Sequence, residues 1–145
     1  MNLKEKWHKS FGVVRHVADG AIWALGMITL NLGLTFWAFE AFPGVFSNPA
    51  YDTLREERWM LLLFAYGFML CGAVMQLGFA HRACCFRAVA CVAASLLYVV
   101  LIACVFWPDS ATAIVVYGTI SVTLFSIGVT EIVDDIGGLA PWTSR

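Results

Sequence analysis

Long uninterrupted runs of apolar residues dominate the chain. Four of them, at residues 20–39, 59–80, 88–107 and 111–130, contain no Lys, Arg, Asp or Glu. Each is close to the ~20 residues that an α-helix needs to cross about 30 Å of hydrocarbon. The alternation of apolar and polar residues that is typical of lipid-facing β-strands is absent. The sequence therefore predicts an all-α membrane protein: one integral membrane domain over residues 1–145, built as a bundle of four transmembrane helices.

The first 19 residues follow a different pattern. At about 100° per residue, Leu3, Trp7, Phe11 and other apolar side chains gather on one helical face, and charged side chains gather on the opposite face. A cationic amphipathic helix of this kind lies in the headgroup layer of a membrane. We expect an N-terminal amphipathic interfacial helix over residues 1–19, with a bend at Gly20 that leads into the first span.

Composition narrows the function classes. The chain is 61% hydrophobic and 13% charged, with a mean hydropathy of +0.79. A soluble domain averages about 45–50% apolar and about 25% charged residues, so the composition excludes a disordered chain and disfavours a water-soluble globular enzyme. The formal net charge of −1 gives no basic field for nucleic acid. The lipid bilayer is the expected environment, and nucleic acid is not an expected partner.

Basic residues set the predicted orientation, because cytoplasmic segments of membrane proteins are enriched in Lys and Arg. With the N-terminus inside, seven of the nine basic residues fall in cytoplasmic segments, and only Arg55 and Arg58 fall outside. Trp37, Trp59 and Trp107 then lie at the outer ends of the spans, at the headgroup level that tryptophan prefers. We expect both termini to be cytoplasmic, in a protein of the bacterial inner membrane.

Motifs for catalysis, cofactors and metals are absent from the sequence. The five cysteines include no Cys-x-x-Cys pair, and the three histidines show no spacing that suits a haem or metal ligand set. No nucleophile elbow, P-loop or zinc-protease motif is present. The sequence predicts no catalytic residue, no cofactor and no metal, and favours a protein that is not an enzyme.

Charged residues gather at the predicted inner ends of the spans, at one depth. We expect an ion-pair network among the helix ends there, because opposite charges on neighbouring helices attract. A structural link between helices is the first interpretation, and a charged vestibule or docking surface is the alternative. The candidate members are Asp19, Arg82, Arg87, Glu131 and Asp134.

Small and polar residues mark the predicted contact faces, since lipid supplies no hydrophobic drive between helices. One face of the first span carries Gly20, Ala24, Asn31 and Thr35; the second span carries Gly72 and Gln76; the third carries Cys84, Ala88, Cys91, Ser95 and Tyr98. The clearest row lies on the fourth span, with spacings of four, three and four residues: Thr119, Thr123, Ser126 and Thr130. This row either packs against protein or lines an aqueous path in an oligomer.

The sequence is compatible with two functions. The first is a small polytopic membrane protein that acts through protein–protein interaction in the bilayer, as an accessory subunit or an immunity or exclusion protein. Its partner is another membrane protein or further copies of itself. The second is an oligomeric pore of the holin or channel type, favoured by the hydroxyl row and by the N-terminal amphipathic helix.

Overall fold

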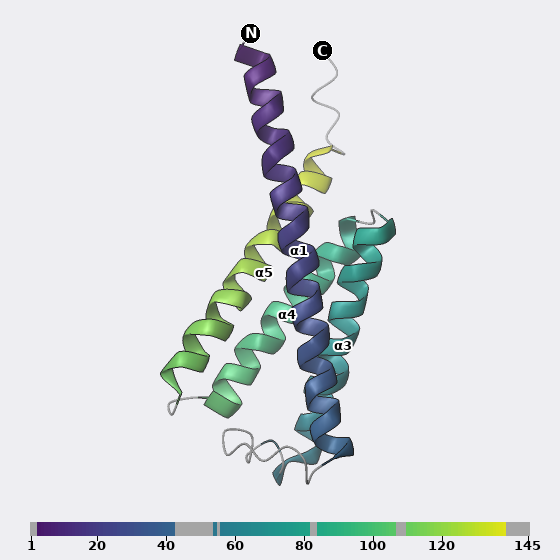
Figure 1. Ribbon diagram of the computed structural model, residues 1–145, viewed down its shortest axis with the longest axis vertical. Coiled ribbons are helices and arrows are strands. Elements are labelled where there is room, and N and C mark those ends of the chain that lie inside the picture. Colours follow the sequence, from purple (N-terminus) through teal and green to yellow (C-terminus); the bar gives the residue numbers. More distant parts are fainter. Residues whose placement is uncertain (1–2, 43–53, 55, 82–83, 107–109, 139–145) are drawn as a thin grey trace.

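Four long helices form the described part of the protein (Figure 1). The computed structural model describes residues 3–42, 54, 56–81, 84–106 and 110–138, with side chains over 19–42, 54, 56–79, 85–106 and 110–133. The elements are α1 (Leu3–Ala41), α3 (Arg58–His81), α4 (Cys84–Leu101) with a π-helical turn η2 (Ile102–Phe106), and α5 (Ala111–Gly138). The described residues contain no β-strand. The all-α four-helix architecture is confirmed.

All four helices contain a segment that is long and apolar enough to cross a membrane. These segments are Asp19–Ala41, Arg58–Phe79, Cys85–Phe106 and Ala111–Val133. Their ends lie within three residues of the predicted boundaries. Length and hydropathy place the spans well because the thickness of the hydrocarbon layer fixes the number of helical residues it can hold. The chain is an integral membrane protein with four spans.

Helix α1 is longer than its span. Its 39 residues extend for about 58 Å at ~1.5 Å per residue, and Figure 1 shows its N-terminal end projecting beyond the other helices. The helix expected over residues 1–19 is present from Leu3 onward, but the bend at Gly20 is not, because α1 continues through it. A Cβ at Gly20 would meet nothing within 4 Å, so the helix is open on that side. The amphipathic side chains of residues 1–18 lie outside the described residues.

Glycines bring α1 and α3 into close contact along most of the span. A Cβ at Gly33 would lie 2.5 Å from the backbone nitrogen of Met69, and one at Gly72 would lie 2.6 Å from that of Leu30. The two backbones therefore approach as closely as they do because neither position has a side chain. Gln76 adds a hydrogen bond from its Nε2 to the carbonyl oxygen of Trp23, at 2.8 Å. The predicted contact face of Gly72 and Gln76 does pack against α1.

An aromatic cluster fills the core and connects all four spans. Phe36 of α1 packs against Phe64 of α3 with ring centroids 6.1 Å apart. Phe68 of α3 and Tyr98 of α4 are separated by 4.7 Å, and Tyr98 and Tyr117 of α5 by 5.8 Å. Aromatic pairs at these distances stabilise packing beyond the area that they bury. The cluster holds the α4–α5 hairpin against the α1–α3 pair.

Candidate functional site

Arg87 is the centre of an ion-pair network near the first turn of α4. Its Nε donates a hydrogen bond to Glu131 Oε2 at 3.0 Å, and its Nη2 donates to Glu131 Oε1. Its Nη1 also contacts Asp19 Oδ1 at 3.4 Å. The two-pronged contact with Glu131 is largely shielded from solvent, with 11% of the Arg87 side chain and 14% of the Glu131 side chain exposed. Paired geometry of this kind gives the strongest charged hydrogen bonds.

The network joins three helices at one end of the bundle. Asp19 belongs to α1, Arg87 to α4 and Glu131 to α5, so the structure brings together three of the five predicted network residues. Arg82 and the side chain of Asp134 lie outside the described residues. Helix α5 has few other contacts with α1. The contact therefore fixes how the α4–α5 hairpin sits against α1, and this geometry supports the structural interpretation.

Two further polar contacts lie inside the bundle. The hydroxyls of Ser95 in α4 and Ser121 in α5 are 3.0 Å apart, and both residues are buried. The hydroxyls of Thr29 in α1 and Tyr98 in α4 are 3.4 Å apart, and both are fully buried. Ser95 and Tyr98 lie on the predicted contact face of the third span. Ser121 and Thr29 were missed, because single hydroxyls outside a periodic row give no signal in the sequence.

The hydroxyl row of α5 points away from the bundle. All four of its residues are exposed, and each hydroxyl donates to the carbonyl oxygen four residues earlier at 2.8 Å. The buried side of α5 carries Ser121, Leu124 and Gly128, which lie about 140–200° around the helix from Thr119 at ~100° per residue. Only 17% of this span is buried inside the bundle, against 33–39% of the other three. No described helix covers the row.

The predicted contact face of α1 is also uncovered, so that prediction is wrong for contacts within one chain. Its four residues are exposed: Gly20, Ala24, Asn31 and Thr35. The helix instead packs with the opposite face, which carries Gly26, Thr29 and Gly33. Both faces of α1 are rich in small residues, and sequence spacing does not rank them. The face that turned inward is the one on which Gly33 allows close approach to the backbone of α3.

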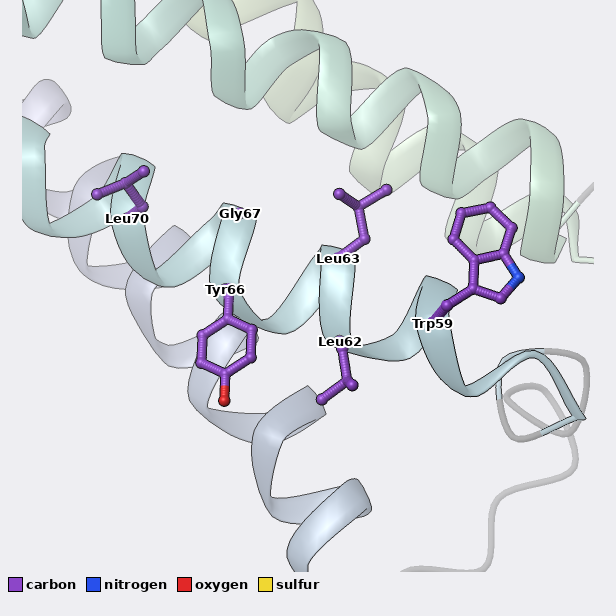
Figure 2. Close-up of a pocket in the computed structure, with 6 residues that line it drawn as sticks. All are labelled: Trp59, Leu62, Leu63, Tyr66, Gly67 and Leu70. Atoms are coloured by element: carbon purple, nitrogen blue, oxygen red, sulfur yellow. The ribbon is translucent and has the colours of Figure 1, made fainter.

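A shallow apolar groove of about 430 Å³ runs along the outer face of α3. Figure 2 shows Leu63 and Tyr66 leaving the helix on opposite sides of this groove. The residues that line it are Trp59, Leu62, Leu63, Tyr66, Gly67 and Leu70. The groove offers apolar contact and no carboxylate, imidazole or amine for chemistry. It fits the hydrocarbon surroundings of a span.

The described side chains gather into no group of three or more His, Cys, Asp or Glu that could hold a metal ion. Cys71 and Cys91 are buried in α3 and α4, whereas Cys85 and Cys104 are exposed. The side chains of the three histidines and of Cys84 lie outside the described residues.

Comparison with known proteins assigns no relative. No protein family, curated protein or solved structure matches this chain. The function therefore has to follow from the surfaces that the four-helix bundle presents to its surroundings.

Proposed function

We propose that the protein is a non-enzymatic membrane protein that binds another membrane protein inside the bilayer, through the exposed face of α5. The observation that carries this proposal is the row Thr119, Thr123, Ser126 and Thr130, which lies opposite the buried side of the least buried span. An accessory subunit and an immunity or exclusion protein both act in this way.

Hydroxyl groups form more favourable contacts with a neighbouring protein than with lipid. Each hydroxyl of the row already donates to its own helix, so it can face hydrocarbon without an unpaired donor. Its remaining lone pairs find donors only on a neighbouring protein, where such contacts contribute about 0.6 kcal/mol each on average. Ser and Thr are also small enough to let a second helix approach closely. The row thus suits a helix of a partner protein.

An oligomeric pore is the second candidate, because the same row could line an aqueous path. The position of the charges favours the first candidate. The charged side chains of the network, Asp19, Arg87 and Glu131, lie at one end of the spans, and Glu40 and Arg58 lie at the other. A selective ion path usually has a charged ring or a carbonyl filter within the membrane, and the exposed row of α5 has neither.

Thiol labelling separates the two candidates. In a chain whose five native cysteines are replaced by alanine, single cysteines at positions 119, 123, 126 and 130 are expected to stay unlabelled by a membrane-impermeant maleimide, as are cysteines at the comparison positions Ile120 and Phe125. The physical reason is that maleimide needs a hydrated thiol, and neither lipid nor a packed partner helix provides water. The measurement is gel-shift labelling in intact membranes. Labelling at the four row positions, with protection at the other two, would establish the pore instead.

Partner binding is tested by purification in a mild detergent followed by mass spectrometry. The wild-type protein is expected to retain one membrane protein reproducibly, and Ser126→Phe is expected to lose at least nine-tenths of it, because the bulky ring blocks helix approach. Leu70→Phe is the matched control: it adds a ring at an exposed site on α3 (Leu70 is 67% exposed) and should retain the partner. Equal retention by both variants contradicts binding through α5.

The proposal includes cytoplasmic termini in a bacterial inner membrane, supported by the bias of basic residues. An alkaline phosphatase fused after Arg145 is expected to be inactive, since that enzyme works only outside the cytoplasm. The control is the same reporter inserted after Asn48, between the first two spans, where activity is expected. High phosphatase activity in the Arg145 fusion would contradict a cytoplasmic C-terminus.

A further inference from the structure

Asn31 lies at the centre of the first span and faces away from the bundle. The span runs from Asp19 to Ala41, so Asn31 is one residue from its midpoint and therefore near the bilayer midplane. The residue is exposed. Its backbone oxygen accepts a hydrogen bond from Thr35, but its side-chain carboxamide makes no hydrogen bond to any residue that the structure describes.

A carboxamide without a partner is most unfavourable at this depth. It carries two N–H donors and one oxygen acceptor, and the hydrocarbon offers neither donor nor acceptor to them. Unlike the α5 hydroxyls, Asn31 does not satisfy its donors on its own helix. The bare side chain in lipid is therefore not a stable end state, and another protein segment should cover it.

The residues around Asn31 form a seam that is suited to a second helix. Their positions alternate in steps of four and three residues, which is the spacing of a coiled-coil contact line: Ala24, Ile28, Asn31, Thr35 and Ala38. The first four are exposed and Ala38 is half-buried. Most of them are small, so two backbones can approach closely enough for side-chain amides to meet.

We propose that this seam pairs with the same seam of a second copy of the chain, so that α1 packs against α1 in a parallel dimer with the two Asn31 carboxamides hydrogen-bonded to each other. Two copies insert with the same orientation, so their Asn31 side chains lie at the same depth. A carboxamide is both donor and acceptor, so two of them related by a two-fold axis can each donate one N–H to the oxygen of the other. A different partner protein would need its own polar group at the same depth.

The dimer uses a different face from the α5 surface and does not depend on the proposed function. The Thr35 hydroxyl of the seam donates to its own helix, so Asn31 carries the one carboxamide of the seam, and an Asn in such a position fixes register and the number of helices. Asn31 thus specifies a pair of α1 helices in register. Both α5 faces of the dimer remain available for the binding of a partner protein.

Self-association is measured with the full-length protein alone in liposomes of phosphatidylethanolamine and phosphatidylglycerol. Two differently labelled pools are mixed, and energy transfer is followed against the protein-to-lipid ratio. Wild type is expected to form dimers, and Asn31→Leu is expected to weaken dimerisation at least tenfold. Asn31→Gln, which keeps the carboxamide, should recover much of the affinity. Ser126→Phe, on the α5 face, should dimerise like wild type.

A second seam variant distinguishes a loss of dimerisation from a folding defect. Ala24→Phe keeps Asn31 but blocks close approach, and it should also weaken dimerisation at least tenfold while its helical circular dichroism matches that of wild type. A monomeric wild-type protein at all protein-to-lipid ratios would overturn the proposal. So would dimerisation that survives both Asn31→Leu and Ala24→Phe, or dimerisation that Ser126→Phe abolishes instead.

Discussion

Replacing Gly33 with alanine is expected to lower the free energy of unfolding by about 3 kcal/mol, at the upper end of what overpacking a tight interface costs. The added Cβ would lie 2.5 Å from the backbone nitrogen of Met69 and 2.8 Å from the carbonyl oxygen of Ala65. Both atoms belong to the backbone of α3 and cannot rotate away. The α1–α3 pair would have to separate along the bundle, which loosens the aromatic core between them.

The measurement for Gly33 is reversible unfolding in mixed micelles of dodecyl sulfate, followed by circular dichroism. Gly72→Ala should behave similarly, since its Cβ would meet the backbone of Leu30 at 2.6 Å. Gly118→Ala is the matched control, because nothing lies within 4 Å of its Cβ. It should be neutral or slightly stabilising, as alanine favours a helix more than glycine does. If the free energy of unfolding of Gly33→Ala is no lower than that of Gly118→Ala, α1 and α3 do not approach as closely as described.

Replacing Arg87 with alanine is expected to have the largest effect of any charge removal, about 3–5 kcal/mol, because it leaves the shielded Glu131 carboxylate without its cation. Arg58→Ala provides the control at the other end of the bundle. Arg58 Nε lies 2.6 Å from Glu40, but 76% of the Arg58 side chain is exposed. Exposed pairs contribute about 1 kcal/mol or less, so its loss should be small.

Charge reversal tests whether Arg87 and Glu131 act as a pair. Arg87→Glu should destabilise the protein at least as much as alanine does, and Glu131→Arg in the same chain should restore part of the loss. The unfolding free energies of wild type, both single variants and the double variant form a thermodynamic cycle. Coupled residues are not additive, so additive losses would show that the contact contributes nothing specific to stability.

The charged network shows how far sequence reasoning reached. The depth of a residue in the membrane follows from its position along a span. Asp19, Arg87 and Glu131 could therefore be assigned to one level without a structure. Pairing of the acids near the end of the fourth span with Arg82 and Arg87 was also expected, but the sequence did not rank those acids, because several of them share that level. The rotation of α5 about its own axis decided that Glu131 faces α4, and the packing of Ser121 against Ser95 at 3.0 Å is part of what fixes that rotation.

Helix faces show where sequence reasoning failed. Small residues at helical spacing predicted contact faces on every span, and on α3 and α4 those faces do pack within the chain. On α1 and α5 they turn outward. The sequence marks a surface that suits protein contact, but it does not say whether the contact is made within the chain or with another one.

The sequence by itself determined the number of spans, their ends and their helical state. These properties depend on a fixed hydrocarbon thickness and on the need of every backbone group in lipid for an internal hydrogen bond. Tertiary structure alone decided which face of each helix is covered and which ion pair forms. These depend on distances between segments far apart in the chain, where backbone approach at Gly33 and Gly72 outweighs any local preference. The outward faces of α1 and α5 result from that choice.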